Sequence, residues 1–136
     1  MHIKNLSALP AVLLFSACAL GPSAAVDATG LGNHTVAQEV RYALFLGEET
    51  VNRAVGRLVN TPEILGRDDP RPRLRGLGFD CAPLPAASCT YEGSATSILR
   101  SPDRPGDTRL TTHVDIRVML DNKPFAVASR IRRENF

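Results

Sequence analysis

The sequence predicts an α+β fold in which two N-terminal helices pack on one face of a three-stranded antiparallel sheet, as a two-layer sandwich. Residues 48–59 place apolar side chains at the i, i+3, i+4, i+7 and i+8 spacing of one helix face. Residues 112–120 alternate apolar and polar side chains, as in a strand with one buried face. The 136 residues, of which 43% are hydrophobic, are enough for one modest domain.

The chain begins with the features of an export signal. Lys4 gives a short positive start, residues 6–15 are mostly apolar, and the small residues Ser16 and Ala17 follow. The apolar run has about half the length of a transmembrane helix and is interrupted by Pro10. We therefore expect residues 1–17 to be a signal peptide that is removed on export.

The end of this leader, Phe15-Ser16-Ala17-Cys18, resembles the lipobox of bacterial lipoproteins, although Phe15 stands where that family usually has Leu. The resemblance implies that Cys18 is acylated through its sulfur, becomes the new N-terminus and anchors the protein to a membrane through fatty acyl chains such as palmitate. Because Ala19 is not Asp, the sorting of Gram-negative lipoproteins implies the outer membrane, facing the periplasm. Ordinary cleavage at Ala17-Cys18-Ala19 or Ser23-Ala24-Ala25 is the alternative, and it would release a soluble protein.

After the cysteine, residues 18–32 are rich in Ala, Gly and Ser and contain little that a core would bury. We expect this segment to be a flexible tether. The single α+β domain is then expected to span residues 33–136.

Two helices are predicted at the start of this domain. Thr35 and Gln38 have the spacing of a capping box, and the first helix should run from residue 35 to residue 46, before Gly47. Its expected buried face contains Val36, Val40, Ala43 and Leu44. The second helix, of about eleven residues, should start at the acidic Glu48 and Glu49 and end at Asn60, with Pro62 beyond it.

The rest of the domain is predicted to be a loop and three strands. Residues 66–76 carry four arginines and two prolines and are expected to form an exposed loop, because proline disrupts a helix interior. Strands are expected at 88–99, with Gly93 as a weak point or bulge, at 112–120 and at 125–132. Turn-forming residues 121–124 join the last two strands into a hairpin.

Three cysteines are present, and lipid on Cys18 would leave Cys81 and Cys89 as a pair. An oxidising compartment and the turn-forming segment between them predict a disulfide, worth about 2.5 kcal/mol for so short a loop. A redox role would normally show a Cys-x-x-Cys motif, and a zinc site would need two further ligands, for which only His34 and His113 remain. No metal or other cofactor is therefore predicted.

The element order, together with the stretch LGEETVNRAVGRLVNTP, resembles the small outer-membrane lipoprotein domain of the BamE/SmpA type. In that family a glycine precedes a short helix that ends near a proline, as Gly47 and Pro62 do here, although the spacing between them is longer in this chain. The resemblance covers roughly residues 35–133. It implies the fold and a role in the cell envelope, and it assigns no binding residue.

A catalytic triad can be drawn from His113, Asp115 and either Ser94 or Ser97, since His113 and Asp115 lie on one face of a strand. The alternative is a local salt link on a solvent-exposed face. No nucleophile elbow, phosphate-binding loop or metal-ligand spacing accompanies these residues. We therefore expect no enzyme activity, no catalytic residue and no small-molecule substrate.

Arginines form two concentrations of charge along the chain. They are Arg67, Arg71, Arg73 and Arg75 in the predicted loop, and Arg130, Arg132 and Arg133 near the C-terminus. Guanidinium groups suit contact with anionic lipid head groups or with an acidic protein surface. The alternative is solubilising charge, partly neutralised by neighbouring acids. The net charge of +2 is too small to predict nucleic-acid binding.

Two functional hypotheses follow. The first is a non-enzymatic envelope lipoprotein, anchored by its N-terminal lipid, with a structural, assembly or protein-binding role toward an envelope protein partner. The second is a small disulfide-stapled inhibitor or binding module for a secreted or periplasmic enzyme, in which the segment between Cys81 and Cys89 would present a rigid loop.

Overall fold

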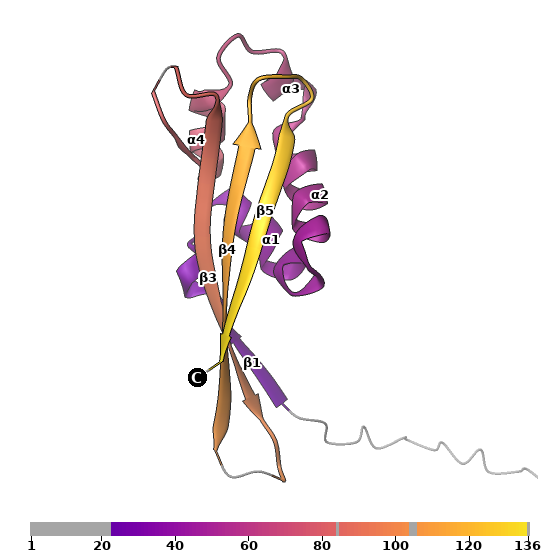
Figure 1. Cartoon of the computed structure of the whole chain (residues 1–136), viewed down its shortest axis with the longest axis vertical. Coiled ribbons are helices and arrows are strands. Elements are labelled where there is room, and N and C mark those ends of the chain that lie inside the picture. Colours follow the sequence, from indigo (N-terminus) through magenta and orange to yellow (C-terminus); the bar gives the residue numbers. More distant parts are fainter. Residues whose placement is uncertain (1–22, 84, 104–105, 136) are drawn as a thin grey trace, which may run out of the picture.

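The computed structural model describes residues 23–83, 85–103 and 106–135, and it is an α+β fold with one antiparallel sheet (Figure 1). The strands are β1 (Ser23–Asp27), β2 (Asp80–Cys81), β3 (Ser88–Arg100), β4 (Asp107–Met119) and β5 (Ala126–Asn135). The helices are α1 (Thr35–Ala43), α2 (Glu48–Val59), α3 (Pro62–Leu65) and α4 (Arg71–Leu77), with 3-10 turns η1 (Thr29–Leu31) and η2 (Leu44–Leu46). The α+β class is as predicted, whereas the expected two helices and three strands undercount the elements.

The sheet has five strands, of which β1, β3, β4 and β5 are neighbours in that order. Strand β2 pairs with the start of β3, and β1 pairs with its end. The register between β3 and β4 is continuous, and Gly93 lies directly opposite Val114. The bulge expected at Gly93 is therefore wrong. A Cβ atom there would lie 2.7 Å from the Tyr91 hydroxyl oxygen, so glycine is needed for this close approach.

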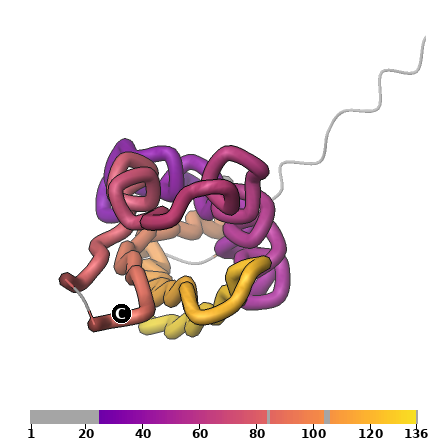
Figure 2. Tube along the Cα trace, turned by 90° about the horizontal axis from the view of Figure 1, so that it is seen from above, coloured from indigo at the N-terminus to yellow at the C-terminus, as the bar shows by residue number. Residues whose placement is uncertain are grey.

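The helices cover one face of the sheet and leave the other open, as the view from above shows (Figure 2). On α2, four residues of the predicted face, Val51, Ala54, Val55 and Val59, are buried, and the fifth, Leu58, is half-buried. These side chains join the apolar face of β4, where Val114, Ile116 and Val118 are at most 1% exposed. Burial of this apolar surface from both layers is the main stabilising term of the fold.

The end of α2 is tied to the β4–β5 hairpin by a reciprocal pair of hydrogen bonds. The Asn60 side-chain amide donates to the Phe125 carbonyl oxygen at 3.0 Å, and the Phe125 amide donates to Asn60 Oδ1 at 2.7 Å. Phe125 is 4% exposed, so the hairpin turn also contributes a core side chain. The helical layer and the last two strands are thereby held in one orientation.

The N-terminal segment differs from the expected tether. Within residues 18–32, Ser23–Asp27 form β1, which pairs antiparallel with residues 96–100 of β3, and Thr29–Leu31 form η1. The Tyr91 hydroxyl group donates to the Leu31 carbonyl oxygen at 2.6 Å and fixes η1 against β3. The ordered domain therefore begins by Ser23, earlier than the predicted residue 33, because β3 extends beyond the helical layer and accepts another strand.

The segment 66–76 is also only partly a loop, since α4 occupies Arg71–Leu77. Its prolines stand at Pro70, the N-cap, and at Pro72 in the first turn. The first-turn amides have no partner within a helix, so proline is tolerated there. Leu74, which is 0% exposed, attaches α4 to the core.

The start of α1 differs from the predicted capping box. His34, and not Thr35, is the N-cap residue, and no side chain caps the helix there. The helix ends at Ala43 and continues as the 3-10 turn η2 to Leu46, so the predicted end of the helical segment is nearly right. No helix of the described residues combines the length and apolar composition needed to cross a membrane.

Candidate functional site

The helix-free face of the sheet is the candidate functional surface, and we call it the open face. Strand alternation directs its side chains away from the core, and the register aligns them in rows across β3, β4 and β5. Three successive rows are Thr90–Arg117–Ala128, Glu92–Asp115–Arg130 and Ser94–His113–Arg132. Polar and charged groups fill most of these positions, which suits a polar ligand or partner.

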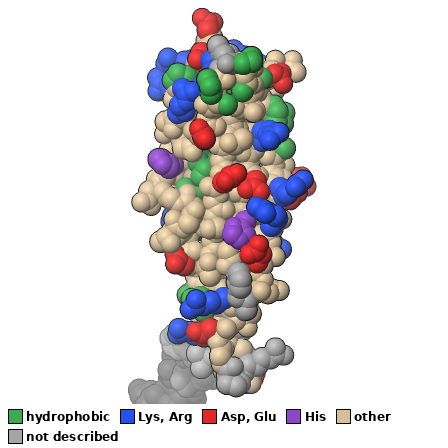
Figure 3. All heavy atoms as spheres, turned by 60° about the vertical axis from the view of Figure 1, so that its left-hand side comes forward, with side chains coloured by type: hydrophobic (Ala, Val, Ile, Leu, Met, Phe, Trp, Pro, Cys, Tyr) green, Lys and Arg blue, Asp and Glu red, His purple; other side chains and the backbone are tan. Residues whose placement is uncertain are grey.

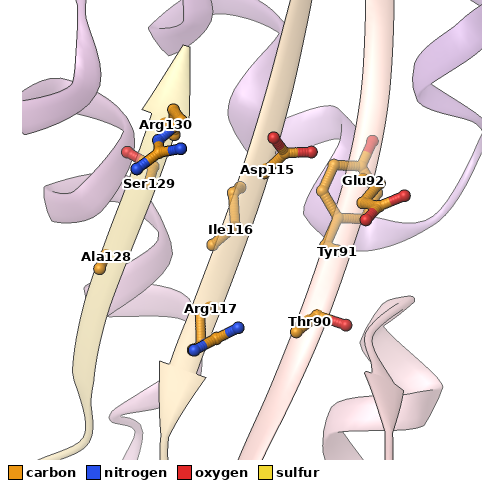
Figure 4. Close-up of a pocket in the computed structure, with 9 residues that line it drawn as sticks. All are labelled: Thr90, Tyr91, Glu92, Asp115, Ile116, Arg117, Ala128, Ser129 and Arg130. Carbon is orange, nitrogen blue, oxygen red and sulfur yellow. The ribbon is translucent and has the colours of Figure 1, made fainter.

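The middle of the open face is a shallow hollow of about 420 Å³, lined by nine residues of the three strands (Figure 4). Its floor is the sheet itself. The side chains of Glu92 and Asp115 stand next to each other on neighbouring strands, and Arg130 lies on the third strand (Figure 4). A molecule bound in such a hollow would be exposed to water on one side. Small-molecule sites are typically concave, mostly apolar clefts that enclose the ligand.

Charges of both signs meet on the open face. Arg132 forms a salt bridge with Asp115, with 3.2 Å between the guanidinium nitrogen and Oδ2. Arg117 and Arg130 are exposed and form no salt bridge with any other described residue. Figure 3 shows that acidic and basic side chains are interspersed on the side of the molecule seen there. The two guanidinium groups therefore remain available to carboxylates of a partner.

Of the residues considered for a catalytic triad, Ser94, His113 and Asp115 share the open face, and Ser97 does not. Ser94 lies directly opposite His113, on the same face as Asp115, whereas Ser97 is buried at 8% exposure. His113 Nε2 lies 3.5 Å from Glu134 Oε2, and Asp115 is bound by Arg132. The expected link between His113 and Asp115 is therefore not the one observed: each side chain has a different partner, Glu134 for the histidine and Arg132 for the aspartate.

A metal site is not formed within residues 23–83, 85–103 and 106–135, because no three His, Cys, Asp or Glu residues there lie close enough to hold an ion. Glu92 and Asp115 are only two carboxylates, and Arg130 is the next group in their row.

The arginines of residues 67–75 bind partners within the domain. Arg71 forms a bidentate contact with Asp69, at 2.7 and 3.0 Å, and these hydrogen bonds lower the pKa of the Asp69 carboxyl. Arg73 lies 2.7 Å from Glu63, and Arg67 lies 3.8 Å from the same carboxylate. Arg75 donates to the Cys81 carbonyl oxygen at 3.1 Å. Internal neutralisation thus accounts for much of this charge.

The two predicted arginine groups do not form one surface. Arg71, Arg73 and Arg75 belong to α4, in the helical layer. Arg130 and Arg132 lie on the open face of β5. The structure instead pairs Arg132 with Asp115 and places Arg130 beside Asp115 in the cross-strand register.

The predicted disulfide is present between Cys81 and Cys89. The two residues lie opposite each other in the β2–β3 register, and their side chains are 5% and 0% exposed. The segment between them is mostly exposed where it is described, and the Ala87 carbonyl oxygen accepts a hydrogen bond from the Leu120 amide at 2.7 Å. The disulfide is therefore part of the core, beneath an exposed loop. Cys18 and the predicted signal peptide lie outside the described residues.

No family model matches this chain, and no curated protein or solved structure matches it either. The resemblance to the BamE/SmpA type and the lipobox therefore both remain predictions.

Two features of the surface were not predicted as candidate sites. The first is the pair Arg117 and Glu92 on the open face: strand alternation predicts that Arg117 faces solvent, but neither residue was named as a possible contact. The second feature is a group of exposed apolar residues near β1, described below. It depends on how β1 and η2 meet in space, and no local period predicts that.

Proposed function

We propose that this protein is a non-enzymatic lipoprotein of the cell envelope, held at the outer membrane by acyl chains on Cys18 and facing the periplasm. Its role is structural or in assembly, through binding of another envelope protein. The leader that ends in Phe15-Ser16-Ala17-Cys18 supports the anchor. The disulfide supports it independently, because it uses two of the three cysteines and leaves Cys18 for lipid.

The open face is the observation that carries the protein-binding role. It spans three strands, has charges of both signs, and contains two arginines, Arg117 and Arg130, that no described carboxylate neutralises in a salt bridge. Protein interfaces are enriched in arginine, and complementary charge sets their orientation and their rate of association. An acidic patch on an envelope protein is the surface that this face fits best.

A second candidate, an inhibitor or binding module for a secreted or periplasmic enzyme, is favoured by the loop between Cys81 and Cys89. The buried disulfide and the Ala87–Leu120 hydrogen bond fix both ends of this loop, while Pro83, Pro85 and Ala87 are exposed. A loop held in one conformation loses little entropy on binding. This candidate would place the contact at the loop and not on the open face.

Site-specific photo-crosslinking separates the two candidates. A photoreactive amino acid is introduced at Arg130 on the open face or at Ala86 in the loop, in the full chain within native envelopes. The matched control position is Arg57, which is exposed on α2. Crosslinking of an envelope protein from position 130 alone supports the assembly role, and crosslinking of a hydrolase from position 86 alone supports the inhibitor. Equal labelling from all three positions would contradict a defined protein interface.

A further inference from the structure

Five large apolar side chains are exposed in the described part of the chain. They are Val26 at 51%, Tyr42 at 79%, Phe45 at 37%, Leu46 at 73% and Leu99 at 41%. We call this group the apolar end. Scattered exposed apolar residues are ordinary, whereas a contiguous group of them indicates a surface that is covered by something.

Three of the five residues share one groove, and the other two are their neighbours in the sequence or in the strand register. Val26, Tyr42 and Phe45 line the same groove, of about 520 Å³, between β1 and the α1–η2 segment. Leu46 follows Phe45 in η2. Val26 pairs with Ser97 in the β1–β3 register, and Leu99 is two residues further along β3, on the same side of the sheet. The groove is hence continuous with the apolar side of the strand pair.

The apolar end lies where the chain enters the domain. In Figure 1, β1 and the outer half of the β3–β4 hairpin form the lower end of the molecule, and α4 and the β4–β5 turn lie at the opposite end. Only five residue steps separate Cys18 from Ser23, the first residue of β1. Even fully extended, such a segment spans at most about 18 Å. An acylated Cys18 would therefore hold this end of the domain close to the bilayer.

We infer that the apolar end rests in the interfacial region of the membrane to which Cys18 is anchored. This inference rests on the proposed function, because acylation is what fixes the distance. Tyr and Phe side chains favour the depth of the lipid head groups, and buried aliphatic surface adds to the affinity. Arg41 lines the same groove, and a lipid phosphate is a suitable acceptor for the outer nitrogens of its guanidinium group.

The polar groups around the groove are compatible with this orientation. Asp27 also lines the groove, but its Oδ1 accepts hydrogen bonds from the Thr29 amide at 3.0 Å and the Thr29 hydroxyl at 2.8 Å. These hydrogen bonds from Thr29, in η1, stabilise the ionised carboxylate and lower the pKa of Asp27. At the opposite end, α4 and the disulfide loop would face the periplasm, so the arginines of α4 would meet proteins and not lipid.

The absence of tryptophan from the chain allows a direct test with a single introduced indole. The full chain, isolated from cell envelopes after expression with its own leader, is reconstituted in vesicles of phosphatidylethanolamine and phosphatidylglycerol, with or without bromine on the acyl chains. The reporter variant is Tyr42→Trp at the apolar end, and the control is Asn122→Trp in the exposed β4–β5 turn. We expect the Tyr42→Trp emission to shift to the blue and to be quenched by brominated lipid, while Asn122→Trp keeps both its wavelength and its intensity.

The other possible results would contradict the inference, and each points to a different cause. If both variants float with the vesicles and neither is quenched, the anchor stands and the docking of the apolar end is wrong. If neither floats, the proposed lipid anchor fails together with the docking. A blue shift that grows with protein concentration, without quenching by brominated lipid, would instead identify a second copy of the chain as the occupant. Leu46→Trp, at an equally exposed position, should repeat the Tyr42→Trp result and controls for local misfolding.

Discussion

Glu48 closes the outer edge of the sheet: its Oε1 atom accepts a hydrogen bond from the backbone amide of Ile131 at 2.8 Å. The same residue's carbonyl oxygen accepts a hydrogen bond from the Ser129 hydroxyl at 3.1 Å. Among the residues that the structure describes, β5 pairs with a strand on its β4 side alone, so its other side presents backbone groups to which a foreign strand can add. The first residue of α2 therefore protects an edge strand as well as beginning a helix.

Replacing Glu48 with Ala should weaken the domain and expose this edge. We expect a loss of about 1 kcal/mol in the free energy of unfolding, the size of one exposed charge-assisted hydrogen bond. Self-association that rises with protein concentration should accompany it, measured by light scattering. Glu49→Ala is the matched control, since Glu49 contacts only the exposed Arg53 and should cost about 0.3–0.5 kcal/mol without self-association. Identical behaviour of the two variants would contradict the role given to Glu48.

Tyr91→Phe should release the N-terminal segment from β3. The substitution removes the 2.6 Å hydrogen bond to the Leu31 carbonyl oxygen and leaves that buried acceptor without a partner. The expected cost is about 1–3 kcal/mol in unfolding free energy. Hydrogen exchange should accelerate most in β1 and η1. Tyr42→Phe, at the other tyrosine, should change stability by less than about 0.5 kcal/mol, because that side chain is exposed.

The same tyrosine predicts a loss of stability at alkaline pH. Burial raises the pKa of Tyr91 from 10.0 to about 12. Between these values the unfolded chain releases the proton while the folded chain retains it, so stability is complete below pH 10 and falls as pH rises toward 12. Denaturation from pH 9 to about 12 in a Tyr42→Phe background measures this slope. A further Tyr91→Phe change should flatten it, and an unchanged slope would exclude Tyr91 as the cause.

Replacing Gly30 or Gly56 with Ala should change the stability of the protein in opposite directions. A Cβ atom at Gly30 would lie 2.4 Å from Ser94 Oγ and 2.6 Å from the Ser94 carbonyl oxygen, so Gly30→Ala should cost about 1–3 kcal/mol by displacing η1. Gly56 lies within α2 and has nothing within 4 Å of such an atom. Gly56→Ala should therefore stabilise the protein by about 0.5–1 kcal/mol. Thermal unfolding of both variants checks the signs, and a neutral Gly30→Ala would show that η1 packs more loosely than described.

Removing the disulfide should cost about 2.5 kcal/mol for a loop of this length. The double variant Cys81→Ala, Cys89→Ala is compared with the wild-type protein in urea, with and without reductant. Reductant should destabilise the wild-type protein by about the same free energy and leave the double variant unchanged. If reductant leaves the unfolding free energy of the wild-type protein unchanged, the disulfide does not stabilise the fold.

Helices and strands whose apolar residues recur at a regular spacing were predictable from the sequence. Helix α2 was predicted close to its observed bounds, Glu48–Val59, and β4 was predicted with the correct buried face. In both, burial of one side of the element leaves a repeating apolar pattern. Strand β1 has no such pattern, because its pairing depends on the distant, protruding end of β3. Helix α4 was missed because prolines were read as helix breakers, although both stand at its start.

The same distinction holds for the candidate site. The Cys81–Cys89 bond followed from cysteine parity and compartment, and the outward direction of Asp115 and Arg130 followed from strand alternation. The pairing of the arginines could not be predicted, since Arg73–Glu63 depends on how α3 and α4 pack. The apolar end also required tertiary structure, because Val26 and Phe45 lie in separate, weakly patterned segments that meet only in the fold.

Mass spectrometry of the N-terminal peptide from protein isolated out of its native envelope tests the central claim most directly. The account predicts a mature chain that starts at Cys18 and has two acyl chains attached through its sulfur. A mature chain that starts beyond residue 18, or a Cys18 that carries no lipid, would contradict the anchor. It would also remove the basis for placing the apolar end at a membrane.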